Sequence, residues 1–114
     1  MTINIDREQL LANFGDDQEL LFESIELFLE RVGGRYKDLD DAVKNRDAQK
    51  VREAGHTIKG MLGNFCTGEP FEFAKNLELM GKEGKLDNVD QALQSFKTSL
   101  DELCKYLADW LKEE

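Results

Sequence analysis

The only histidine of this 114-residue chain, His56, lies in a stretch whose residue types could carry chemistry. Lys59 and Gly60 follow it by three and four residues, so in a helix both would lie beside the imidazole. A neutral imidazole has a free lone pair on one ring nitrogen and can attack an electrophile. A nearby lysine favours the neutral ring and could offset negative charge added to it. This pattern indicates a histidine that accepts a phosphoryl group.

Three glycines, Gly55, Gly60 and Gly63, occur in the same stretch. Each costs a helix interior roughly 1 kcal/mol relative to alanine, so each needs a reason. A helical wheel that starts at Val51 places Gly60 and Gly63 on the side of His56, where bare backbone would admit a docking protein. Gly55 falls inside the apolar stripe, where close packing against another helix explains it better.

The same wheel predicts that His56 faces solvent, roughly 140° from Val51. The buried stripe comprises Ala48, Val51, Ala54, Gly55, Ile58, Leu62 and Phe65. Between residues 47 and 65 three bases and two acids give a local charge of +1, which suits a group that becomes a dianion. We therefore predict His56 as the phosphorylated residue and Lys59 as the stabiliser of its phosphoryl group. The predicted docking residues are Gln49, Arg52, Gly60 and Gly63.

The net charge of −9 argues against nucleic acids and anionic membranes as partners, because both attract clustered bases. No stretch approaches the ~20 apolar residues of a membrane span, and no signal-peptide pattern is present. Cys66 and Cys104 lie far apart in the sequence, so we interpret both as free, buried thiols. Two cysteines and one histidine are too few ligands for a closed zinc site. We expect a cytoplasmic protein with no metal and no cofactor of its own.

Helix formers dominate the chain and proline occurs once, which predicts an all-α fold. A short helix is expected from Asp6, with Gln9 completing a capping box, to Phe14. A long helix should follow from the Asp16-Asp17 pair to about Asn45. Its apolar phase runs through Gly33-Gly34, so we expect one helix, which the glycines could bend; two helices broken there is the alternative.

Asp47 is expected to cap the helix that carries His56. The next helix should begin near residues 67–70, with Pro70 in its first turn, and end within residues 81–84. Residues 87–90 should cap the last helix, whose apolar stripe reaches Trp110 or Leu111. Together these elements predict one domain, residues 1–114: an up-and-down antiparallel four-helix bundle with a short extra N-terminal helix that closes one end.

The segment His56-Thr57-Ile58-Lys59-Gly60 resembles the His-x-x-Lys-Gly core of the histidine phosphotransfer (HPt) domain family. The likeness extends upstream through Asp47 and 51–54. Downstream it includes Asn64 and the pattern Ala74-x-x-Leu77-Glu78-x-x-Gly81-Lys82. It departs from the family at Gly55, Met61-Leu62 and 65–68, which bears on the choice of partner.

The resemblance implies a monomeric phosphorelay intermediate. A receiver domain would dock over Gly60 and Gly63 and pass its phosphoryl group from aspartate to His56, beside Lys59. A second receiver, in a response regulator or hybrid kinase, would then take it. The magnesium ion would belong to the receiver, and the chain would be a phosphocarrier without ATP-dependent kinase activity.

Two alternatives stay open from the sequence. The chain could be a helical interaction module whose histidine is never phosphorylated. It could also be the phosphoacceptor domain of a chemotaxis-type kinase, although no linker to an ATP-binding domain follows the last helix.

Overall fold

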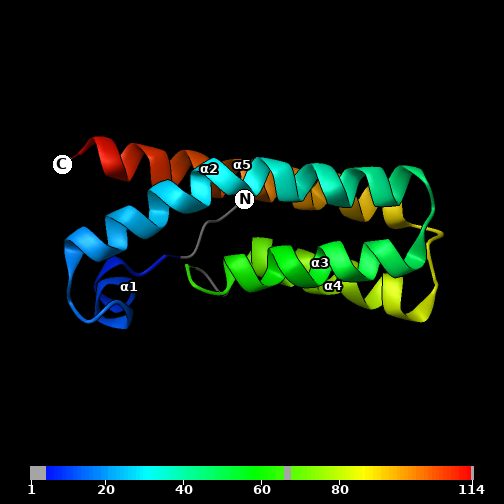
Figure 1. The fold of residues 1–114 in the computed structure, drawn as a ribbon, viewed down its shortest axis with the longest axis horizontal. Helices are drawn as coiled ribbons and strands as arrows, with labels where there is room; N and C mark the ends of the chain where they lie inside the picture. The colour runs from blue at the N-terminus through cyan, green and yellow to red at the C-terminus, as the bar shows by residue number, and fades with distance from the viewer. Residues whose placement is uncertain (1–4, 66–67, 114) are drawn as a thin grey trace.

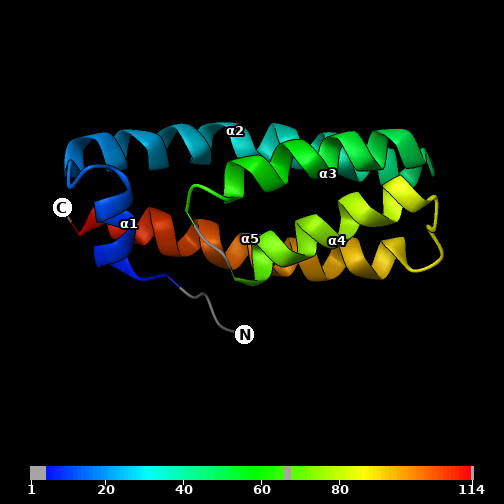
Figure 2. The same ribbon diagram turned by 90° about the horizontal axis from the view of Figure 1, so that it is seen from below.

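The computed structural model describes residues 5–65 and 68–113, and these form helices without any strand (Figure 1). The helices are α1 (Arg7–Asn13), α2 (Gln18–Lys44), α3 (Ala48–Leu62), α4 (Glu69–Glu83) and α5 (Val89–Lys112). Helices α2 to α5 run up and down, each packed against the next, and α2 packs against α5 to close the bundle (Figure 2). The predicted all-α four-helix bundle with an extra N-terminal helix is confirmed.

Aspartates begin three of the helices, as predicted. The side chains of Asp6, Asp17 and Asp47 each accept a hydrogen bond from the backbone N–H three residues later, at 3.0 to 3.1 Å. The capping box at α1 is only half formed, because the Gln9 side chain donates to Asn13 instead of turning back.

The starts of the two remaining helices lack a side-chain capping bond. Asn88 is the N-cap residue of α5 but makes no side-chain capping bond, since its φ of −110° and ψ of 20° depart from the extended geometry of a capping residue. Helix α4 has Pro70 in its first turn, as predicted, and Gly68 as its N-cap. Thr67 and Cys66, to which the prediction also assigned roles, lie outside the described residues.

Helix α2 is continuous through Gly33-Gly34, which excludes the two-helix alternative. Figure 1 shows its first part inclined to the rest. A Cβ built on either glycine would meet no atom within 4 Å, so neither glycine serves close packing.

The short helix α1 closes one end of the bundle, beneath the ends of α2 and α5 that project past α3 and α4 (Figure 1). Arg7 fixes it there by donating to the Tyr106 hydroxyl at 2.7 Å and to both carboxylate oxygens of Glu113. Its guanidinium also lies 4.6 Å from the centre of the Trp110 ring. Leu10 of the same helix is buried in the core, so the predicted role of this helix is confirmed.

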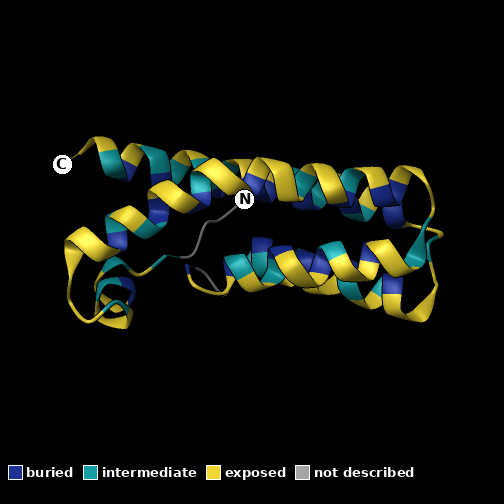
Figure 3. Cartoon of the chain, viewed as in Figure 1, coloured by how far each residue is buried: buried dark blue, intermediate teal, exposed yellow. Residues whose placement is uncertain are grey.

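The core lies between the helices, where the buried bands in Figure 3 face one another. On α3 the predicted stripe is buried at Val51, Ile58 and Leu62, and Trp110 rather than Leu111 is buried on α5.

Cys104 is half-buried, and its removal from solvent raises the thiol pKa to about 11. Over the described residues, none of the helices combines the length and apolar character needed to cross a membrane.

Helices α3 and α4 approach each other so closely that glycine is required between them. A Cβ built on Gly81 would lie 2.5 Å from the backbone nitrogen of Arg52 and 2.7 Å from the backbone oxygen of Ala48. The helix ends within the predicted range of residues 81–84, at Gly84, which adopts the left-handed conformation with φ of 69°. Gly81 is therefore a packing residue within the helix.

Replacing Gly81 by alanine should weaken this contact, whereas the same change at Gly33 should not. We expect Gly81→Ala to lower the free energy of unfolding by about 1–3 kcal/mol, because two backbones must separate. Gly33→Ala should raise it by up to ~1 kcal/mol through helix propensity, because the site is open. Urea unfolding of both variants measures the difference, and equal stabilities would contradict the close packing.

Candidate functional site

His56 stands on the solvent-facing side of α3, with 70% of its side chain exposed. This confirms the exposure predicted from the wheel. The helix is fixed behind it by Val51 and Ile58, which are fully buried. The imidazole is thus held by a rigid helix while its ring stays open to an incoming protein.

A carboxylate to which the sequence analysis assigned no role contacts the imidazole. Glu78, on α4, places Oε2 2.9 Å from Nδ1 of His56. Its other oxygen, Oε1, lies 2.6 Å from Nζ of Lys59. The three residues therefore form one network, with the carboxylate between the lysine and the histidine.

The close packing of α3 against α4 puts Glu78 in this position. A Cβ built on Gly55 would lie 3.0 Å from the backbone nitrogen of Glu78 and 3.1 Å from its Cα. Gly55 precedes His56 directly, so the contact sets the Glu78 backbone beside the histidine. The prediction that Gly55 serves helix packing is confirmed.

The charge state of Glu78 decides which ring nitrogen of His56 is free. Partial burial raises the pKa of Glu78, but hydrogen bonds from Lys59 and His56 outweigh this and hold the pKa below its ordinary value. An ionised carboxylate only accepts hydrogen bonds, so Nδ1 must carry the proton that it shares with Glu78. In the neutral imidazole, Nε2 then holds the free lone pair.

The predicted docking residues lie around this network. Gln49 and Arg52 line an open hollow of about 340 Å³ together with Glu53, His56 and Glu78, and Gln49 donates to Glu53 at 2.8 Å.

The two glycines of the predicted docking set differ from each other. A Cβ at Gly60 would meet nothing within 4 Å, so this position is open to a partner. A Cβ at Gly63 would lie 3.4 Å from the ring of Phe71, which therefore flanks that end of the surface. Gly60 is the barer of the two.

The surface around His56 is less positive than the charged residues of α3 alone suggest. Glu78 pairs with Lys59 and cancels the local charge of +1 counted within residues 47–65. A count along one helix could not include it, because Glu78 comes from the neighbouring helix. In the parts of the chain that the structure describes, no group of three or more histidine, cysteine or acidic residues could hold a metal ion.

The family model for the Hpt domain matches residues 23–110. The chain belongs to the Hpt domain family. Membership places it among the histidine phosphotransfer domains of two-component signalling. The match covers α3 and α4, and with them the network of His56, Lys59 and Glu78.

A solved structure similar to this Hpt domain is that of histidine-containing phosphotransfer protein B (HptB) from Pseudomonas aeruginosa PAO1. The two share 17% sequence identity over 100% of this chain and 99% of that chain, with a TM-score of 0.89. At this identity the likeness shows the fold. No curated protein matches the chain.

The Glu78 contact predicts a single neutral tautomer of His56. At a pH where the ring is neutral, ¹⁵N NMR should show a protonated Nδ1 and an unprotonated Nε2. Glu78→Ala should give a mixture of tautomers. Glu83→Ala is the matched control, since Glu83 is exposed on the same helix and lines its groove with α5. A mixture in the unaltered domain would contradict the contact.

The lowered pKa of Glu78 also predicts a pH dependence of stability. A carboxylate with a lowered folded pKa stabilises the fold above its ordinary value of 4.5, and this contribution is lost as the pH falls through the folded pKa. The destabilisation caused by Glu78→Ala should therefore be smaller near pH 3 than near pH 7. Urea unfolding at both values measures it, and a constant difference would contradict it.

Proposed function

We propose that this Hpt domain is a phosphocarrier whose His56 accepts a phosphoryl group from the phosphoaspartate of one receiver domain and passes it to the aspartate of another. The observation that carries the proposal is the exposed imidazole, with Nδ1 occupied by Glu78 and Nε2 free. The partners are receiver domains of response regulators or hybrid histidine kinases.

The transfer step follows from this arrangement. The Nε2 lone pair attacks phosphorus in line with the departing aspartate oxygen, so that an N–P bond forms as the P–O bond breaks. The ring becomes a cationic phosphoimidazole with its proton still on Nδ1. The Glu78 carboxylate stabilises that charge. Because a protonated ring leaves more readily, the same contact assists the return of the phosphoryl group to a second aspartate.

Lys59 acts through Glu78 in the unphosphorylated domain. Its Nζ holds Oε1, which leaves Oε2 directed at the histidine. After transfer, the phosphoryl group offers Lys59 a second anionic partner on the same face. We propose that the lysine then shares its charge between the two, which is the stabilising role that the sequence suggested.

The surrounding surface admits the receiver. Gly60 provides bare backbone beside His56, and Gly63, Gln49 and Arg52 extend the docking surface along α3. The magnesium ion is supplied by the receiver, and no cofactor of the chain itself is required. We propose that residues 1–114 act as one monomeric domain in the cytoplasm, without ATP-dependent kinase activity.

Removal of the histidine tests the proposal. His56→Gln should abolish uptake of ³²P from receiver domains charged with acetyl phosphate, while circular dichroism and the unfolding midpoint stay unchanged, because the side chain is exposed. Phosphate uptake by His56→Gln at the unaltered rate would contradict the proposal.

Glu78→Ala should retain uptake but lower its rate about 10–100-fold, the loss expected for a hydrogen bond to a charged group. The control Glu83→Ala should transfer normally. If Glu78→Ala transferred as fast as its control, the carboxylate would have no part in the reaction.

The open backbone at Gly60 generates a separate prediction about docking. Gly60→Ala should fold at least as stably as the unaltered domain and accept phosphate with little loss, because its Cβ meets nothing. Gly60→Trp should also fold but lower receiver-dependent transfer at least about tenfold by obstructing the partner. Labelling of His56 by phosphoramidate, a small donor, should be retained in both variants. Normal transfer to Gly60→Trp would show that the partner docks elsewhere.

A further inference from the structure

The register between α3 and α4 brings exposed cations from both helices to the same face. Gly55 lies against Glu78, and Gly81 lies against Arg52, so the two helices run antiparallel with these residues at matching levels. Lys82 follows Gly81 directly and is level with Arg52. Lys75 precedes Glu78 by three residues, so it lies about one turn away, near the level of Lys59.

Both lysines share the helix face of Glu78, because side chains three and four residues apart are neighbours on a helix. Glu78 contacts His56, so Lys75 and Lys82 lie on either side of that contact. Arg52 is on the same side of α3 as His56, one turn earlier. We call Arg52, Lys75 and Lys82 the cationic rim. All three are exposed.

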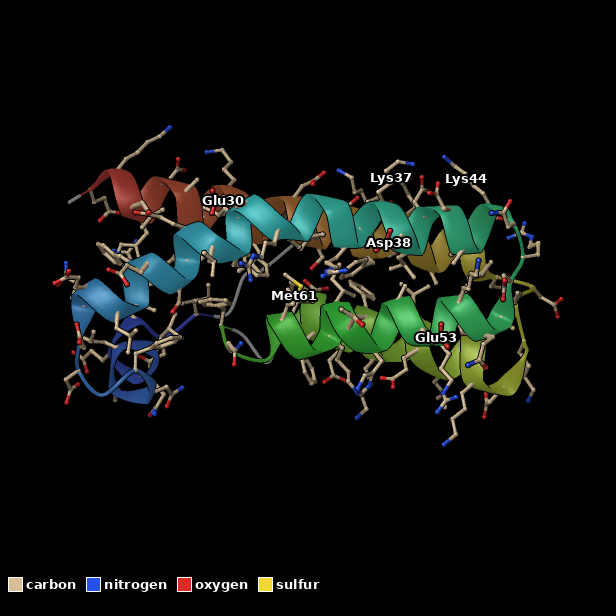
Figure 4. The ribbon with its side chains drawn as sticks, viewed as in Figure 1. Glu30, Lys37, Asp38, Lys44, Glu53 and Met61 are labelled. Atoms are coloured by element: carbon tan, nitrogen blue, oxygen red, sulfur yellow. The ribbon has the colours of Figure 1, made fainter. Side chains whose placement is uncertain are left out.

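The rim residues differ from most surface bases in having no ion pair with a described residue. Five bases elsewhere (Arg35, Lys37, Lys44, Lys97 and Lys105) pair with an acid one turn away, whereas Arg31, Lys50, Lys85 and Lys112 share with the rim the lack of an ion pair with a described residue. Lys37 and Lys44, which project from α2 on the side away from α3 in Figure 4, pair with Asp41 and Asp40. Of the acids near the rim, Glu78 contacts Lys59 and His56, and Glu53 accepts from Gln49. Glu72, three residues before Lys75 on α4, is exposed and forms no ion pair with a described residue.

We propose that the cationic rim binds a carboxylate-rich surface that surrounds the phosphorylated aspartate of the partner receiver. The inference rests on the proposed function and adds Lys75 and Lys82 to the docking residues. An acidic protein fits this surface better than nucleic acid does, because the chain as a whole carries −9 and would repel an extended polyanion.

The placement of the charges also orients the partner. Because the chain carries a net charge of −9, most of its surface would repel an acidic receiver. The rim beside His56 would attract it. Long-range charge of this kind acts mainly on the association rate and is screened by salt. The rim should therefore control how fast the receiver finds the histidine, and leave the reactivity of the imidazole unchanged.

Charge reversal tests the rim. The variants are Lys75→Glu, Lys82→Glu and the double variant, with Lys50→Glu as the matched control. Lys50 is exposed on α3 but lines the groove toward α2. The donor is the receiver domain, charged with acetyl phosphate, that transfers fastest to the unaltered chain. Second-order rate constants are measured in low salt and in 0.5 M NaCl, and His56 is labelled separately with phosphoramidate.

We expect each single rim variant to lower the rate constant about fivefold in low salt and the double variant more, with the loss shrinking in 0.5 M NaCl. Lys50→Glu should change the rate less than about twofold. Phosphoramidate labelling of His56 should be equal in all variants.

If the rate constants of the rim variants equalled that of Lys50→Glu, or if salt did not reduce their losses, the proposal that the rim binds the receiver would be overturned. The proposed function would stay intact. A failure of the unaltered chain to accept phosphate from any receiver would overturn both.

Discussion

The close packing of α3 against α4 is the constraint on which the site depends. Glycine at positions 55 and 81 lets the two backbones meet where a methyl group would lie 2.5 to 3.0 Å from the opposite main chain. That approach sets Glu78 beside His56 although 22 residues separate them in the chain. The long helices α2 and α5 carry much of the core behind this pair, so the face that carries His56 is built on a rigid support.

Two properties of the site matter for the proposed chemistry: the orientation of the His56 imidazole and the negative charge of Glu78. Phosphoryl transfer needs a nucleophile with a free lone pair and a place for the charge that develops, and little else from the acceptor protein. Under the proposed function, a single carboxylate would meet both needs, because Glu78 contacts one ring nitrogen and would stabilise the ring when it becomes cationic. Lys59 keeps that carboxylate ionised and directed. A Cβ at Gly60 would meet no atom within 4 Å, so the proposed reaction would be accessible to a large partner.

Much of the fold followed from periodicity and helix signals, which are local. The aspartate caps, the continuous α2 and the exposure of His56 were all predicted from spacing. The role of Glu78 was not, because a contact between two helices leaves no local signal, and one acid on an amphipathic helix looks like another. The packing role of Gly81 was missed for the same reason, although the helix ends within the predicted range of residues 81–84. Ala74, Leu77 and Gly81 form the buried stripe of α4, and Glu78 directly follows Leu77. This position at the edge of the stripe was the one sequence signal that could have indicated a contact with α3.

The central claim is that the geometry of the unphosphorylated domain selects Nε2 of His56 as the reacting atom. The most direct measurement is ³¹P–¹⁵N coupling in the ¹⁵N-labelled domain after phosphorylation by a receiver. The account predicts that phosphorus is coupled to Nε2, with Nδ1 still protonated. Phosphorus bound to Nδ1, or found on any residue other than His56, would contradict it.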